Sequence, residues 1–158
     1  MLSGGGGDDT LLGGSGVDTL NGGAGSDRLE GGSSDDVLNG GAGYDVLLGG
    51  SGLDRFVFTS LDGDLVSDWS AGEKIDVSAL GAVTFSIATR AGRATVSFDL
   101  DGDGQFDDGF LLVNAGSQRF GNGDIVTAAA GSAGLQGFGG GDYASGGANA
   151  FGNDLVLV

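Results

Sequence analysis

Apolar residues recur every nine positions in the first third of the chain, and one polar pattern separates them. Residues 4–58 contain six consecutive blocks of nine residues with no insertion. Each block begins with two glycines, has Asp at its sixth position and has Leu or Phe at its eighth. The repeated carboxylates are Asp9, Asp18, Asp27, Asp36, Asp45 and Asp54, and the apolar residues are Leu11, Leu20, Leu29, Leu38, Leu47 and Phe56.

A repeat this short predicts a solenoid, because one block cannot bury its apolar side chain without stacking on copies of itself. The three residues after each Asp are the ones suited to a strand. Their alternation turns Leu or Phe inward, whereas residues such as Thr10 and Leu12 face outward. The glycines suit tight turns. Two blocks then make one coil, and six blocks make three coils. The alternative is a Gly-rich disordered linker, which a strict period with an inward apolar residue disfavours.

The pattern changes after residue 58, where short apolar runs alternate with turn residues at irregular spacing. Residues 83–87, 94–98, 110–114 and 124–126 are rich in β-branched and aromatic residues, and we expect antiparallel strands there. Residues 131–158 are rich in Gly, Ala and Ser and have the composition of a flexible tail. The sequence therefore predicts three parts, residues 1–58, 59–130 and 131–158.

The repeated aspartates suggest a cation site in every turn. Turns on the same side of a solenoid are two blocks apart, so Asp9, Asp27 and Asp45 form a first Asp ladder. Asp18, Asp36 and Asp54 form the second Asp ladder. Like charges about 5 Å apart repel by about 1 kcal/mol per pair even in a water-like dielectric. Calcium removes this repulsion and accepts six to eight oxygens, whereas magnesium requires a small, strict octahedron.

The nine-residue pattern resembles the repeats-in-toxin (RTX) family, whose nonapeptide GGxGxDxUx, with U a large apolar residue, binds calcium in a parallel β-roll. The resemblance implies an all-β fold, with a right-handed parallel β-roll followed by an antiparallel β-sandwich-like cap. It makes the six aspartates ligands and places ions between Asp9 and Asp27, Asp18 and Asp36, Asp27 and Asp45, and Asp36 and Asp54. The ligand-bearing turns would begin at Gly4, Gly13, Gly22, Gly31, Gly40 and Gly49.

One residue departs from the pattern. Ser34 stands at the fourth position of its block, where the other five blocks have Gly. If that position requires a positive φ angle, Ser34 strains the turn, and the sites that include Asp36 are weaker.

Residues 56–80 resemble the segment that caps the roll in secreted RTX proteins such as serralysin-type metalloproteases, alginate epimerases and lipases. This resemblance makes Asp62, Asp64 and Asp68 candidate calcium ligands at the C-terminal end of the roll. The alternative is that these carboxylates are solvated turn residues and that Trp69 belongs to the core.

A second acidic pattern lies between two expected strands. Asp99, Asp101, Asp103, Gly104 and Asp107 fit DxDxDGxxD, which resembles the opening of an EF-hand loop, and Gln105 stands among them as a further candidate ligand. Phe110 occupies the position of the bidentate Glu, and strands rather than helices flank the loop. The alternative is an acidic hairpin loop that keeps a sheet edge soluble.

Charge and composition narrow the functional classes. Six basic against 22 acidic residues give a net charge of −16, which disfavours nucleic acid and anionic membranes as partners and favours cations. About four to seven calcium ions would cancel half or more of this charge. With 37 Gly and no Pro, ordering the chain is costly, so we expect a largely disordered metal-free form that folds on binding calcium.

The sequence lacks His and Cys, so it offers no disulfide, no thiolate and no His-based triad. No apolar run is long enough to insert in a membrane, and the N-terminus lacks the features of a signal peptide. The last five residues, Asp154 followed by Leu-Val-Leu-Val, resemble the uncleaved C-terminal secretion signals of RTX proteins exported by type I machinery.

Three functional hypotheses follow. The leading one is a calcium-binding RTX module that is exported by a type I system and folds outside the cell or at its surface. The second is a self-assembling extracellular structural protein, such as a surface-layer, adhesive or matrix protein, which would stack head-to-tail through an uncovered roll edge if Met1 is the true start of the chain. The third is an enzyme, which we do not expect, because the regular aspartates already have a role as ligands and His is absent.

Overall fold

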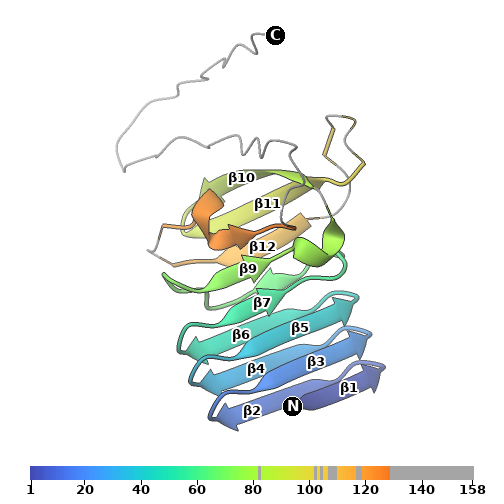
Figure 1. Cartoon of the computed structure of the whole chain (residues 1–158), viewed down its shortest axis with the longest axis vertical. Helices are drawn as coiled ribbons and strands as arrows, with labels where there is room; N and C mark the ends of the chain where they lie inside the picture. Colours follow the sequence, from blue (N-terminus) through green and yellow to red (C-terminus); the bar gives the residue numbers. More distant parts are fainter. Residues whose placement is uncertain (82, 102, 104, 107–109, 117–118, 129–158) are drawn as a thin grey trace.

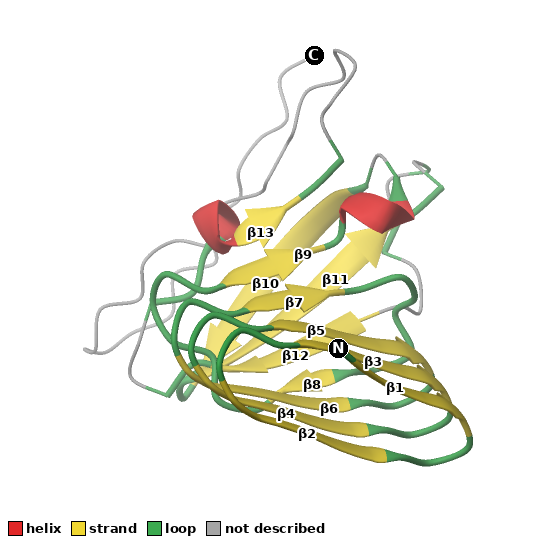
Figure 2. Ribbon diagram, turned by 60° about the horizontal axis from the view of Figure 1, so that its bottom comes forward, coloured by secondary structure: helices red, strands yellow, loops and turns green. Residues whose placement is uncertain are grey.

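Two β-sheets form the framework of the computed structural model, which describes residues 1–81, 83–101, 103, 105–106, 110–116 and 119–128 (Figures 1 and 2). The first sheet contains, in spatial order, β1 (Leu2–Gly6), β3 (Thr19–Ala24), β5 (Val37–Ala42), β7 (Arg55–Val57), β9 (Lys74–Asp76) and β13 (Ile125–Val126). The second contains β10 (Thr84–Arg90), β11 (Arg93–Asp99), β12 (Phe110–Asn114), β8 (Leu65–Val66), β6 (Val46–Ser51), β4 (Arg28–Ser33) and β2 (Thr10–Ser15).

The strands β1 to β9 form a parallel solenoid of about four coils. Successive strands alternate between the two sheets, and each of β1 to β6 pairs in parallel with the strand two further along the chain. Leu11 therefore lies opposite Leu29, and Leu29 lies opposite Leu47. Figure 2 shows the two sheets facing each other, with turns joining them on both sides. The predicted parallel β-roll is confirmed.

The strands are longer and the coils more numerous than the sequence predicted. Strands β2 to β6 span six residues rather than three, because the second glycine of the next block and the residue after it also pair across the sheet. Gly14, for example, lies opposite Gly32, and Ser15 lies opposite Ser33. Leu2 lies opposite Leu20, so the residues before the first complete block already supply a strand.

The roll also continues beyond residue 58, because its inward apolar position persists after the regular glycine pairs end. Val66 follows Phe56 by ten residues, and Ile75 follows Val66 by nine. Val66 lies opposite Leu47, and Ile75 lies opposite Phe56. Two irregular blocks therefore extend the six regular ones.

The interior of the roll is a column of stacked apolar side chains. Each inward residue from Leu20 to Phe56 has no exposed surface, and Val66 and Ile75 extend the column without a gap. Leu2 and Leu11 lie at the N-terminal end of the column and are only partly buried. The outward Leu12 is 58% exposed, as the alternation predicted.

The strands after the roll extend its two sheets. Strand β11 pairs antiparallel with both β10 and β12, as predicted, and β12 also pairs in parallel with β8. The prediction of an antiparallel strand at residues 124–126 is wrong, because β13 pairs in parallel with β9. The physical reason is that β9 is the last strand of the roll in the first sheet and leaves an edge unpaired. Strand β13 pairs with this edge and runs in the same direction as the strands of the roll.

The roll and the following strands share one hydrophobic core. Phe85, Val96 and Phe98 are buried in the same cluster as the inward residues of the roll, and Trp69 meets Phe120 edge-to-face at 5.1 Å between ring centroids. Two short 3-10 helices, Ser78–Leu80 and Asn122–Asp124, follow β9 and precede β13. No helix among the described residues combines the length and apolar character needed to span a membrane.

Candidate metal centre

The first position of each block has no room for a Cβ atom, so it requires glycine. A Cβ at Gly4 would lie 2.5 Å from Asp9 Oδ2 and 2.7 Å from the carbonyl oxygen of Gly22. At the other five first glycines, a Cβ would lie 3.1 Å or less from Oδ2 of the Asp in the same block. Each turn therefore folds its Asp side chain back against its own first glycine.

The second and fourth positions of each block require a positive φ angle instead. The second glycines have φ between 94° and 114°, and the fourth glycines have φ between 94° and 143°. Ser34 adopts φ of 87° at the fourth position, so the expected strain is present there. Nothing but glycine adopts this conformation without cost, which explains why the repeat is so rich in it.

The two Asp ladders form as the sequence predicted. In the first Asp ladder, the backbone N–H of Asp9 donates to Asp27 Oδ1 at 2.8 Å, and the N–H of Asp27 donates to Asp45 Oδ1 at 2.8 Å. In the second, Asp18 donates to Asp36 Oδ1 at 2.7 Å and Asp36 to Asp54 Oδ1 at 2.8 Å. Every pair of turns for which we expected a shared ion is therefore directly stacked.

The second carboxylate oxygen of these side chains is buried and finds no hydrogen-bond donor among the described residues. This holds for Oδ2 of Asp9, Asp27, Asp36, Asp45 and Asp54. The last four of these side chains are only 1–2% exposed. A buried carboxylate oxygen without a partner is costly, and a hard cation removes that cost. The donor set of carboxylates and glycine backbone carbonyls fits calcium.

Burial also affects the ionisation of the ladder carboxylates. It is the largest cause of a raised pKa at Asp45 and Asp54, and the preceding carboxylates, Asp27 and Asp36 respectively, raise the pKa further. The backbone hydrogen bond to each carboxylate opposes this rise but does not overcome it. Burial and the neighbouring charge therefore make these two carboxylates easier to protonate than carboxylates in water.

The first Asp ladder has a fourth member. Asp64 Oδ1 accepts the backbone N–H of Asp45 at 2.9 Å, the same bond that links the regular members. Asp64 is 1% exposed, and burial, with the Asp45 and Asp62 charges, raises its pKa to about 7. Asp62 is exposed, and its Oδ2 accepts the N–H of Gly43 at 3.1 Å. Of these two candidates, Asp64 therefore continues the ladder and Asp62 lies at its rim.

The second Asp ladder ends in a loop with two carboxylates, Asp68 and Glu73. Asp68 accepts the backbone N–H groups of Gly49 and Gly50, each at 3.0 Å. Glu73 was not among the residues predicted from the sequence, although it is fully buried and Lys74 after it lies opposite Arg55. The signal that could have revealed it is the nine-residue step from Val66 to Ile75, which puts Glu73 at the Asp position of the block.

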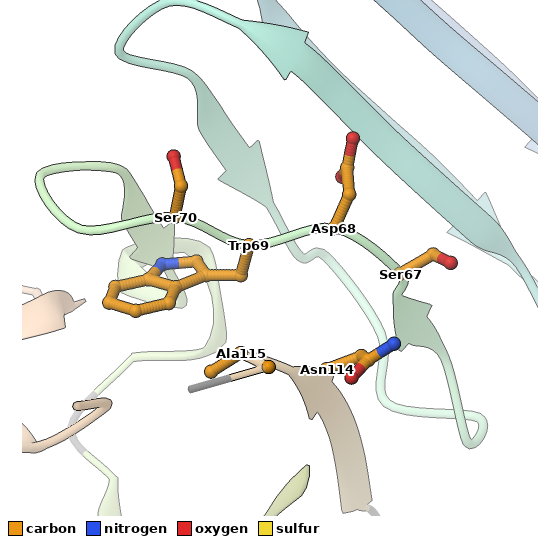
Figure 3. A pocket seen from close by; sticks show the side chains of 7 residues that line it. Ser67, Asp68, Trp69, Ser70, Asn114 and Ala115 are labelled. Carbon is orange, nitrogen blue, oxygen red and sulfur yellow. The ribbon is translucent and has the colours of Figure 1, made fainter. Parts of the chain in front are cut away.

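A shallow pocket of about 330 Å³ lies beside this loop, between residues 67–70 and 114–116 (Figure 3). Asp68 and Ser70 point to one side of the loop, and the Trp69 ring lies on the other (Figure 3). Trp69 is buried against Phe120, so it belongs to the core, as one alternative foresaw. The Trp69 indole Nε1 finds no acceptor among the described residues.

Another buried aspartate is satisfied without a metal. Asp76 is 4% exposed, and its carboxylate accepts hydrogen bonds from Arg55 and from the backbone of Ser78. Burial would raise its pKa, but the Ser78 hydrogen bonds and the Arg55 guanidinium together hold the pKa below its ordinary value. Asp76 therefore ties β9 to β7, whereas the ladder aspartates remain unsatisfied.

The loop after β11 gathers three of its predicted ligands. Asp99, Asp101 and Asp103 each place one carboxylate oxygen within 4.8 Å of the others, the one such trio of potential metal ligands in the part of the chain that the structure describes. Asp103 and Gln105 donate backbone N–H groups to Asp101 and Asp103 respectively, and Asp101 and Gln105 are exposed. Asp107 lies outside the described residues, and so does the predicted secretion signal.

Comparisons with known proteins find similarity both to the nine-residue repeats and to the fold of the chain. Residues 1–29 and 30–58 each match the family described as RTX calcium-binding nonapeptide repeat (4 copies). The solved solution structure of the AlgE6R3 subunit of the Azotobacter vinelandii mannuronan C5-epimerase is similar over 95% of this chain and 92% of its own, with 26% sequence identity and a TM-score of 0.56. No curated protein matches the chain.

Proposed function

We propose that this chain, whose first 58 residues are RTX calcium-binding nonapeptide repeats, is a module that folds when calcium binds between its stacked turns. The observation that carries the proposal is the row of buried Asp Oδ2 atoms that lack a partner among the described residues. These oxygens stand at the same place in consecutive turns, where one ion can bridge two carboxylates. Calcium then replaces a repulsion between turns with an attraction.

The ladders provide five steps at which an ion can sit. Four are the steps expected from the regular repeat, and the fifth joins Asp45 to Asp64, which makes the same backbone bond. The trio Asp99, Asp101 and Asp103 offers a further site outside the roll. Together these sites lie within the expected range of about four to seven ions, each of which offsets part of the −16 net charge.

The setting we propose is extracellular. Calcium sites of extracellular modules bind with dissociation constants of about 10⁻⁴–10⁻³ M, so such a roll stays unfolded where calcium is scarce and folds where it is abundant. Export by type I machinery, through a signal in the last residues, suits a chain that leaves the cell unfolded. Within this proposal the chain binds calcium and acts as a folding module rather than as an enzyme.

A circular dichroism titration tests calcium-dependent folding. We expect little strand signal in excess chelator and a cooperative gain of strand signal as calcium is added. Strand signal that is complete in chelator would contradict the proposal.

Two adjacent aspartates supply a matched control. Asp36 belongs to two of the proposed sites, whereas Asp35 is exposed and its Oδ1 accepts the N–H of Leu53, a bond that an amide oxygen can keep. We expect Asp36→Asn to raise the calcium midpoint roughly tenfold or more, the effect of about 1.4 kcal/mol, and Asp35→Asn to leave it nearly unchanged. Equal midpoints for both variants would contradict the assignment of ligands.

A second proposal, self-association, rests on the two edge strands. Strands β1 and β2 each end a sheet, and neither has a pairing partner on its outer side within the described residues. An uncovered edge favours pairing with another chain, so a head-to-tail extracellular assembly is the alternative function. Sedimentation in saturating calcium distinguishes the two, because a strict monomer at high concentration excludes assembly.

A further inference from the structure

The roll carries a carboxylate at a place where the nonapeptide pattern has already ended. Arg55 lies opposite Lys74 in the pairing of β7 with β9, so Asp54 and Glu73 occupy the same position of neighbouring coils. This is the relation that Asp36 has to Asp54 and Asp45 has to Asp64. Glu73 is therefore the last member of the second Asp ladder, with a side chain one methylene longer.

Glu73 is buried and hydrogen-bonded in a fixed position. Its side chain has no exposed surface, and its two oxygens accept the backbone N–H and the hydroxyl of Ser70 at 2.8 and 3.0 Å. A carboxylate has lone pairs for about four partners, so both oxygens retain the capacity to bind a cation. Ser70 holds the carboxylate in place without neutralising it.

An unsatisfied oxygen lies beside this carboxylate. Asp54 is 1% exposed, and its Oδ2 has no partner among the described residues. A Cβ on Gly49 would touch Asp54 Oδ2, and the N–H of the same Gly49 donates to Asp68, so Asp54 and Asp68 meet at this glycine. A hydrogen bond with Glu73 lowers the pKa of Asp54, the charge of Asp54 raises the pKa of Glu73, and the charge of Asp68 raises the pKa of both.

The adjacent basic side chain, Lys74, interacts with residues 123 and 124 instead of with these carboxylates. The Lys74 amine donates to the carbonyl oxygen of Gly123 at 2.9 Å and lies 3.6 Å from an Asp124 carboxylate oxygen. Two buried carboxylates with a third beside them are unstable without a neutralising charge. Burial, with the charges of Asp54 and Asp68, accordingly raises the pKa of Glu73 to about 7.

We infer that Asp54 and Glu73 form a further cation site at the C-terminal end of the second Asp ladder, with Asp68 as a third charge at its rim. This inference rests on the proposed function, because it assigns one more ion to the same row. With three negative charges around one cation, the site suits a hard divalent ion such as calcium and still better a trivalent lanthanide of similar size. The ion fixes the loop of residues 68–73 against the turn that begins at Gly49, and so holds β9 onto the roll.

The chain contains a reporter for this site. Trp69 is its single tryptophan and lies in the loop between Asp68 and Glu73. Terbium emits strongly when a nearby indole transfers excitation energy to it. Excitation at the red edge of the indole band therefore reports terbium bound near Trp69, because tyrosine and phenylalanine absorb little there.

The chain also contains a matched control, because its two glutamates are Glu73 and Glu30. Glu30 lies on the outer face of β4, where it pairs with Arg28. In Glu73→Gln we expect the loss of one bound calcium by titration calorimetry, the loss of the terbium emission excited through Trp69, and unchanged strand signal in saturating calcium. We expect Glu30→Gln to keep the wild-type stoichiometry and emission.

Two results separate the inference from the proposed function. If Glu73→Gln keeps the wild-type number of calcium ions and the emission, the site is overturned, although the proposed function stands. If the wild-type chain binds no calcium, the proposed function itself fails. Should Glu73→Gln not fold in saturating calcium, Asp68→Asn is measured in the same way: weaker Trp69-sensitised emission supports the site, and unchanged emission overturns it.

Discussion

At the scale of single residues, each position of the repeat meets a different steric, conformational or electrostatic requirement. The first glycine leaves room for the Asp side chain of its own turn, whereas the second and fourth supply positive φ angles. The Asp uses one oxygen to bind the preceding coil and leaves the other unsatisfied. The sequence predicted the residue types and the stacking, because they follow from the period alone. It could not divide the roles among the glycines, since these depend on distances in the folded turn.

Ser34 offers a test at this scale. Replacing it with Gly removes the strain of a positive φ, about 1–2 kcal/mol, against an entropic cost of about 0.5–1 kcal/mol. We therefore expect Ser34→Gly to raise the free energy of unfolding in saturating calcium by about 1 kcal/mol, measured by urea denaturation.

The neighbouring Ser33 is the control for this substitution. It is exposed, and its φ is not positive. Ser33→Gly should lower the unfolding free energy by about 0.5–1 kcal/mol. A loss of stability in both variants would show that the turn at Ser34 is not strained.

At the scale of elements, the inward apolar position defines a coil more reliably than the glycines or aspartates do. Phe56, Val66 and Ile75 keep the column intact where the turn sequences become irregular. The regular repeat predicted the roll but not its length, because the ten-residue step to Val66 breaks the period that was used to recognise it. Because of the same break in the period, Glu73 was not recognised as standing at the Asp position of a block. The parallel pairing of β13 depends on the free edge of β9, which the local sequence does not encode.

The inward column predicts unequal effects for two leucines. Leu38 has no exposed surface, and Leu38→Ala should lower the free energy of unfolding by about 2–5 kcal/mol. Leu12 faces outward and is 58% exposed, so Leu12→Ala should change it by no more than about 0.5 kcal/mol. Chemical denaturation in saturating calcium measures both, and similar losses would contradict the orientation of the strands.

At the scale of the whole molecule, negative charge opposes folding and cations or protons relieve it. The chain has 22 acidic and six basic residues, and buried carboxylates are spread along both ladders. Each strand of the roll contributes one apolar side chain to its interior, so the core is small for a chain with 37 glycines. Under the proposed function, metal binding would contribute folding free energy directly, as it does in small metallodomains.

This balance predicts how the metal-free chain responds to pH. The pKa of Asp64 rises from 3.8, and that of Glu73 from 4.5, to about 7 in the folded metal-free chain. Groups with a raised folded pKa stabilise the fold fully below the unfolded pKa, and this stabilisation is lost as the pH rises through about 7. In chelator, strand signal should therefore grow as the pH is lowered from about 7 towards 4.

The same protons compete with calcium. Calcium affinity should rise with pH across this window, and calcium binding should release protons, which calorimetry in buffers of different ionisation enthalpy measures. Strand signal that falls on acidification in chelator, together with an affinity that does not change with pH, would contradict the assigned burial of these carboxylates.

The most direct measurement is the anomalous scattering of calcium in crystals grown in millimolar calcium. The account predicts peaks between successive turns along both sides of the roll, next to the Oδ2 atoms of the first and second Asp ladders. Well-ordered turns without a peak between any two of them would contradict the claim that calcium holds the coils together.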